Sequence, residues 1–114
     1  MKKFAIGDSV QLKKGVIEPY QEIFDLSGWQ GRITKMFYEE CMECGHKQRY
    51  VSVEYDSITL RQMTEEYILA MRNEGIDIAD SEHLIKNVVP TSPRDTEKET
   101  LEVRMELHKK YYRH

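Results

Sequence analysis

The sequence predicts a mainly β fold, a small barrel with a short helical insertion before the last strand and a helical C-terminal tail. Three observations support this prediction. Several short segments of the 114-residue chain alternate apolar and polar side chains, as half-buried strands do. Residues 64–75 change to helical spacing, and the segment beyond Pro93 opens with a helix-capping pattern.

The first predicted strand follows a glycine–aspartate turn, with a shorter strand at residues 4–6 before that turn. Val10 and Leu12 alternate with polar neighbours, so one face of this strand is apolar. A long polar and aromatic loop is expected over residues 13–27, because a glycine and a proline interrupt any regular element there.

The next two strands are predicted at residues 32–38 and 50–55. They form a hairpin whose long connection, residues 39–48, holds both cysteines. Residues 57–60 are expected to add one more short β segment. A final strand is expected at residues 83–89, where prolines follow.

The helical insertion is predicted at residues 64–75. Tyr67 and Met71 fall on one helical face. Thr64 is suited to cap the N-terminus, acidic residues follow it in the first turn, and Gly75 is suited to end the helix.

The tail, residues 94–114, is predicted to be a charged helix appended to a barrel at residues 1–93. Thr96 and Glu99 form a capping-box pattern, and acidic residues precede basic ones, which matches the helix dipole. The apolar residues between 101 and 107 also alternate, as in a strand. We favour a helix because good helix formers dominate the segment. Four residues follow the 4-3-4 spacing of one helical face, namely Leu101, Met105, His108 and Tyr112.

Composition excludes several classes of protein. The chain has 17 basic and 20 acidic side chains, for a net charge of −3. Residues 51–93 hold 8 acidic against 3 basic side chains, which disfavours contact with nucleic-acid phosphate. No apolar run approaches the about 18 residues of a membrane span. The apolar stretch behind Lys2 and Lys3 is too short for a signal peptide, so a cytoplasmic protein with reduced thiols is expected.

Four segments resemble the strands of SH3-like barrels, and they lie at residues 6–12, 28–33, 51–56 and 84–90. KOW domains, the nitrile hydratase beta subunit and the ferredoxin–thioredoxin reductase variable chain share this general pattern. The sequence looks most like small uncharacterised bacterial proteins that have a similar Gly-Trp-Gln-Gly segment (residues 28–31) and Asp-Ser-Ile-Thr-Leu segment (residues 56–60). The resemblance covers residues 4–90 and implies an SH3-like barrel with a helical insertion.

The cysteines form the sharpest local motif. Cys41 and Cys44 have the C-x-x-C spacing that can hold one tetrahedral metal ion, and His46 follows closely. A structural zinc site usually has four ligands, so another histidine or a second chain would have to complete this one. Three interpretations stay open: a zinc knuckle with ligands Cys41, Cys44 and His46, a redox dithiol, or a polar turn with two idle thiols. The motif fixes no cofactor, and zinc is the metal ion that its ligands would suit.

An aromatic set is the candidate partner-binding surface. Tyr20, Trp29, Tyr38, Tyr50 and Tyr55 are its members. In SH3-type modules such side chains form a groove for extended peptides, and elsewhere they form a cage around a methylated cation. The alternative is that these rings fill a lean barrel core.

The sequence therefore predicts a non-catalytic binding or adaptor module with a protein partner. No enzyme is expected, because no serine or histidine lies in a catalytic pattern and no phosphate-binding loop is present. One alternative is a KOW-like module associated with nucleic acid or the ribosome, and another is a zinc-stabilised accessory subunit of an enzyme. The tail helix docks on its own barrel or on another chain, which leaves a homodimer open. A local basic face would be formed by Lys13, Lys14, Arg32, Lys35, Lys47 and Arg49.

Overall fold

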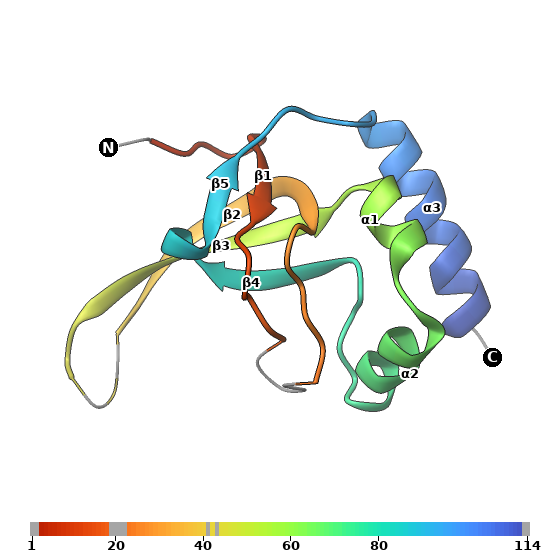
Figure 1. Ribbon diagram of the computed structural model, residues 1–114, viewed down its shortest axis with the longest axis horizontal. Coiled ribbons are helices and arrows are strands. Elements are labelled where there is room, and N and C mark those ends of the chain that lie inside the picture. Colours follow the sequence, from red (N-terminus) through yellow and green to blue (C-terminus); the bar gives the residue numbers. More distant parts are fainter. Residues whose placement is uncertain (1–2, 19–22, 41, 43, 113–114) are drawn as a thin grey trace.

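Five strands form one antiparallel sheet, with three α-helices gathered at one end of it (Figure 1). The computed structural model describes residues 3–18, 23–40, 42 and 44–112. Over these residues the elements, in chain order, are β1 (Ser9–Leu12), β2 (Gln30–Glu40), β3 (Lys47–Tyr55), α1 (Ser57–Gln62), α2 (Glu65–Asn73), β4 (Asp80–Leu84), the 3-10 helix η1 (Ile85–Asn87), β5 (Val88–Pro90) and α3 (Glu97–Tyr111).

The strand order in the sheet is β4-β3-β2-β1-β5, so the last strand lies beside the first. Val10 of β1 faces Gly31 of β2 on one side and Pro90 of β5 on the other. The register between β2 and β3 shifts between Ile33 and Lys35, which marks a β-bulge. A strand-rich fold with a C-terminal helix is thereby confirmed. Closure of the sheet into a barrel stays a prediction.

The element between β3 and α2 is a helix, so the predicted β segment at residues 57–60 is wrong. The Asp56 side chain accepts a hydrogen bond of 2.8 Å from the Thr59 backbone N–H, which caps α1. The predicted second helix is confirmed as α2, with Thr64 as its N-cap. The insertion therefore contains two helices, and it precedes β4 rather than the last strand.

Two other strand predictions are wrong. Residues 4–6 form no strand, because the Asp8 carboxylate accepts a hydrogen bond from the Ala5 N–H and closes a turn. Residues 83–89 do not form one continuous strand, because η1 separates β4 from β5.

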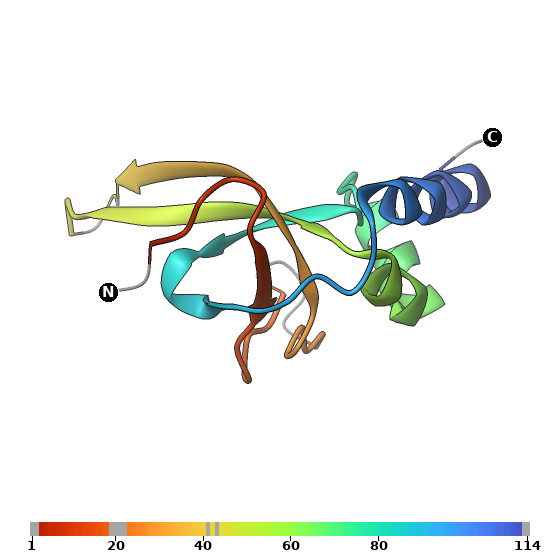
Figure 2. The same ribbon diagram turned by 90° about the horizontal axis from the view of Figure 1, so that it is seen from above.

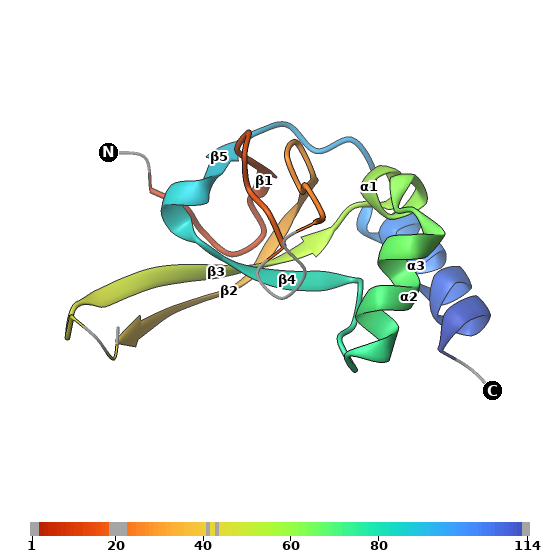
Figure 3. The same ribbon diagram turned by 60° about the horizontal axis from the view of Figure 1, so that its bottom comes forward.

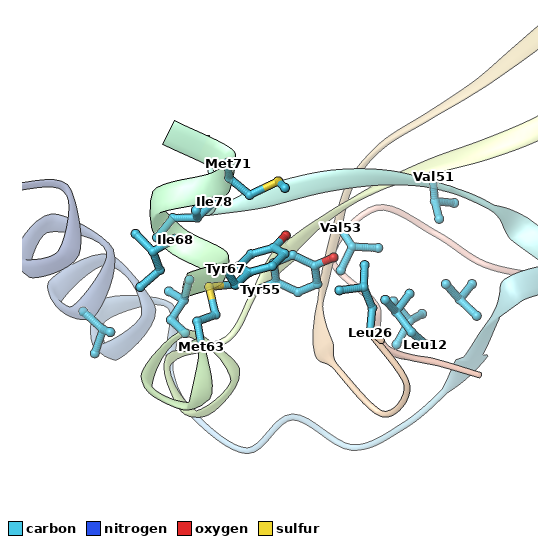
Figure 4. Close-up of a cluster of buried hydrophobic side chains, with 14 of the residues drawn as sticks. Leu12, Leu26, Val51, Val53, Tyr55, Met63, Tyr67, Ile68, Met71 and Ile78 are labelled. Carbon is cyan, nitrogen blue, oxygen red and sulfur yellow. The ribbon is translucent and has the colours of Figure 1, made fainter. Parts of the chain in front are cut away.

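One continuous core runs from the strands, with Val10, Leu12 and Val88 among its members, to α1 and α2. Figure 4 shows Tyr55 and Tyr67 between apolar side chains of the strands and loops, such as Leu26 and Val53, and those of the helices, such as Ile68. Trp29 packs edge-on against both tyrosine rings, with ring centroids 5.3 Å from Tyr55 and 4.9 Å from Tyr67. These aromatic contacts connect the sheet to the helical end of the molecule.

The tail helix α3 docks on its own chain. Both hydrogen bonds of its capping box, between Thr96 and Glu99, are formed, as predicted. Val103 is buried in the core, and the Tyr112 hydroxyl donates a 2.9 Å hydrogen bond to the carbonyl of Ile76. Figure 2 shows the connection from β5 crossing the body to reach α3, which lies beside α1 and α2.

Candidate functional site

The outer half of the β2–β3 hairpin projects from the opposite end of the sheet to the helices (Figure 3). We call residues 38–40 and 47–49, with the described tip residues 42 and 44–46, the arm. In it Tyr38 pairs with Arg49 across the two strands. The pairing of β3 with β4 begins only at Tyr50, so the arm extends beyond the neighbouring strand as a two-stranded ribbon.

Aromatic and cationic side chains stabilise this ribbon, which is otherwise marginal in isolation. The rings of Phe37 and Tyr50 stack across the strands at its base, with centroids 5.5 Å apart and planes 14° apart. Lys35 Nζ lies 5.0 Å from the Phe37 ring, and the Arg49 guanidinium lies 5.7 Å from the Tyr38 ring. Each such contact contributes about 0.5–1 kcal/mol at an exposed site, so the arm presents a partly fixed surface.

The arm exposes side chains of the kind that bind proteins. Tyr38 is 64% exposed and Met42 is fully exposed, and Arg49 lies beside the Tyr38 ring. Tyrosine, methionine and arginine are enriched in the centres of protein interfaces. The arm carries two acidic side chains, Glu39 and Glu40, and two basic ones, Lys47 and Arg49, so it has no net charge.

The structure separates the predicted aromatic set into different places. Tyr55 is fully buried in the core, so it is not part of a binding surface in this structure, and Trp29 is half-buried with its ring packed against the core. Tyr50 lies at the base of the arm and Tyr38 on the arm itself. Tyr20 lies outside the described residues. The burial of Tyr55 has a signal in the sequence, because it continues the apolar alternation of the preceding valines.

The predicted zinc ligands lie at the tip of the hairpin. Cys41 is outside the described residues, while Cys44 and His46 are described and exposed. In the part of the chain that the structure describes, no three histidine, cysteine or acidic side chains are grouped as metal ligands. Zinc binding by Cys41, Cys44 and His46 stays a prediction.

Arg32 is not available to the predicted basic face, because it is bound within the protein. The Arg32 guanidinium donates a hydrogen bond of 2.9 Å to the Thr100 hydroxyl and forms a 2.7 Å ion pair with Asp95. Lys35 and Arg49 lie against aromatic rings of the hairpin, as described above. The remaining basic side chains are divided between the first loop and the arm.

Asp95 is the centre of a buried polar cluster that sequence reasoning missed. Besides Arg32, its carboxylate accepts hydrogen bonds from the Thr100 hydroxyl at 2.6 Å and the Ser57 backbone N–H at 2.8 Å. Burial alone would raise the pKa of Asp95. The hydrogen bonds from Thr100, Ser57 and Arg32 outweigh that effect and lower the pKa to about 2. Asp95 thus joins β2, α1 and α3.

A second ion pair lies beside this cluster. Arg94 donates hydrogen bonds of 3.0 Å and 2.9 Å to the two carboxylate oxygens of Asp56, a bidentate geometry. The same guanidinium donates to the Thr59 hydroxyl at 2.9 Å. In the sequence, residues 92–94 look like a linker into the tail. The partners of Arg94 and Asp95 lie 38 and 63 residues away, so local patterns give no signal for them.

A buried histidine forms a third polar cluster. Nε2 of His83 lies 2.6 Å from the Ser81 hydroxyl and 3.1 Å from the Tyr55 hydroxyl, and these two hydroxyls also bond to each other. Burial lowers the pKa of His83 to about 4 and raises that of Tyr55. The imidazole is therefore neutral at physiological pH, and the three groups satisfy one another inside the sheet.

No family model, curated protein or solved structure matches this chain. Among the described residues, no helix has the length and apolar character needed to cross a membrane. What bears on function is therefore the geometry of the chain itself, and its projecting arm in particular.

Proposed function

We propose that this protein is a non-catalytic adaptor that binds a protein partner through the arm. The observation that carries the proposal is the exposed Tyr38–Arg49 pair, held on a ribbon that projects from the body of the molecule. Tyrosine and arginine are, with tryptophan, the residue types enriched at interface hot spots. A tyrosine ring that is held against an arginine before binding also reduces the entropy lost when a partner binds.

A protein partner fits the arm better than a nucleic acid does. Phosphate binding requires an excess of basic side chains, whereas the charges of the arm segment balance. Arg32, which would extend a basic face toward the arm, is already paired with Asp95. The KOW-like alternative predicts RNA binding that weakens steeply as salt is added.

The first experiment compares the proteins that co-purify with different variants from the source cells. The arm variant combines Tyr38→Ala and Arg49→Ala, and the control combines Ile23→Ala and Lys14→Ala, which also remove one exposed apolar and one exposed basic side chain. A protein partner should be retained by the wild type and the control, and depleted by more than about 30-fold with the arm variant. Equal recovery with all three proteins would contradict the proposal.

A salt-titrated assay with a short single-stranded RNA tests the alternative function. The adaptor proposal predicts no RNA binding at physiological salt. Binding that weakens steeply with salt and is lost in the arm variant would contradict the proposal and favour the KOW-like function.

We further propose that the sheet is closed as an SH3-like barrel. The support is the strand order, with β5 beside β1, and the 3-10 helix just before the last strand. An experimental structure whose five strands enclose one core as in SH3-like barrels would agree with this proposal. A flat sheet with β4 and β5 far apart would contradict it.

A further inference from the structure

One row of side chains along α3 is open to solvent, although its last member, Tyr112, is half-buried and contacts the body. This outer row consists of Leu101, Met105, His108 and Tyr112. Leu101 is 54% exposed and Met105 is 61% exposed, whereas Val103 on the inner face of the helix is buried. The rings of His108 and Tyr112 stack at 4.9 Å, and together with Asp77 the outer row lines an open hollow of about 890 Å³.

We propose that the outer row is the interface of an antiparallel homodimer, in which α3 of one copy packs against α3 of a second copy. The 4-3-4 spacing is that of the apolar seam of two paired helices. A twofold axis midway between Met105 and His108 would place Met105 against His108 of the second copy. The same axis would place Leu101 against Tyr112 of the second copy, so the row is complementary to itself.

Charged residues beside the outer row favour the antiparallel orientation. Glu102 and Lys109 lie seven residues apart and therefore flank the row on the same side. In an antiparallel pair Glu102 of each copy faces Lys109 of the other, so the attractive contact is made twice. In a parallel pair Glu102 of one copy would instead approach Glu97 of the other, and Lys109 would approach Arg104. Both pairs have like charges and would repel.

The charge distribution also explains why a second copy fits better than a different partner. With the twofold axis between Met105 and His108, residues 102–111 of the two helices overlap. The basic last turn, with Lys109, then lies near Glu102 of the other copy at both ends of the overlap. A uniformly basic or uniformly acidic helix would be attracted at only one of these ends. Arg104, on the other side of the row, is already paired with Glu54 at 2.8 Å and with Asp77 at 3.7 Å.

The small size of the interface is typical of a weak dimer. With 15 residues, α3 is about 22 Å long, so two such helices bury less than the about 1,200 Å² of a standard interface. We therefore expect a weak dimer with a dissociation constant of about 10–100 μM.

The experiment measures the mass of the full chain by sedimentation equilibrium, from about 5 μM to about 500 μM. Met105→Glu places a charge at the centre of the outer row, and Met42→Glu is the matched control on the arm, where Met42 is fully exposed. The wild type and Met42→Glu should shift from monomer to dimer, and Met105→Glu should stay monomeric. A monomeric wild type at the highest concentration, or equal dimerisation of Met105→Glu, would overturn the proposal.

A charge exchange tests the orientation, with thermal melting of dilute monomer to show that each variant folds. Glu102→Lys and Lys109→Glu should each weaken the dimer by about 5- to 10-fold, because each creates two repulsive contacts. The double variant should restore wild-type dimerisation. A double variant that dimerises as weakly as the single variants would rule out the antiparallel arrangement.

Discussion

Substitution of Asp95 by asparagine tests how α3 is attached to the rest of the molecule. The Asp95 side chain is 1% exposed, and its ion-pair partner Arg32 is 11% exposed. Asparagine keeps the size of the side chain but removes its charge. Arg32 then keeps its own charge in a buried position without a carboxylate to balance it.

Two arguments give the magnitude of the effect. The pKa of Asp95 is lowered from its usual 3.8 to about 2, and a shift of that size corresponds to about 2 kcal/mol. Breaking a buried ion pair by removing one partner typically costs about 3–5 kcal/mol. We therefore expect Asp95→Asn to lower the free energy of unfolding by about 2–4 kcal/mol.

The assay is urea unfolding followed by the fluorescence of Trp29, the only tryptophan of the chain. Asp77→Asn is the control, because Asp77 is 43% exposed and lies 3.7 Å from its partner Arg104. It should lower the free energy of unfolding by less than about 0.5 kcal/mol.

The pH dependence of the same unfolding experiment shows whether the Asp95 carboxylate causes the difference in stability. The folded-state pKa of Asp95 is lowered, so its contribution is present above pH 3.8 and is lost as the pH falls toward 2. The difference between wild type and Asp95→Asn should shrink over that window. A variant as stable as wild type at neutral pH, or a difference that does not change down to pH 2, would refute the reasoning.

Three further predictions concern His83, Gly31 and Phe37. Folded His83 has a pKa of about 4 against 6.5 when unfolded, so the unfolded state binds more protons in between. The free energy of unfolding should therefore fall by up to about 3 kcal/mol as the pH drops through this window. In urea unfolding, His83→Gln should remove this pH dependence, and the control His108→Gln should retain it. A Cβ on Gly31 would lie 2.1 Å from the Glu54 carbonyl oxygen. Gly31→Ala should therefore lower the free energy of unfolding by about 3 kcal/mol or more, measured by thermal melting. Phe37→Ala removes the stack with Tyr50 and should speed amide exchange in the arm, while the global free energy of unfolding changes by less than about 1 kcal/mol.

Elements whose signals are local could be predicted from the sequence. Thr64 caps α2 and the Thr96–Glu99 capping box begins α3, because a cap depends on residues only three positions apart. The two strands of the hairpin also appear where the apolar alternation indicates, although both continue into the arm. The strand prediction at residues 57–60 failed although the Asp56 cap of α1 also depends on a residue three positions away. The ion pair of the same carboxylate with Arg94, 38 residues away, has no such local signal.

Much of the candidate site could not be predicted, because it depends on which residues the fold brings together. Trp29 and Tyr38 are both aromatic and both near strands, yet one packs against core tyrosines and the other is exposed on the arm. Likewise, composition alone places Arg32 among the basic residues available to a partner. Only the fold shows that Asp95 and Thr100 engage it.

The central claim is that the arm contacts a protein partner, and site-specific cross-linking in the source cells tests it most directly. A photoreactive phenylalanine analogue is placed at position 38, on the arm, or at position 23 in the first loop, where Ile23 is 76% exposed. The adaptor proposal predicts a cross-linked protein adduct from position 38 that is absent from position 23 and is lost when Arg49→Ala is added. Absence of any adduct from position 38, or the same adducts from both positions, would contradict it.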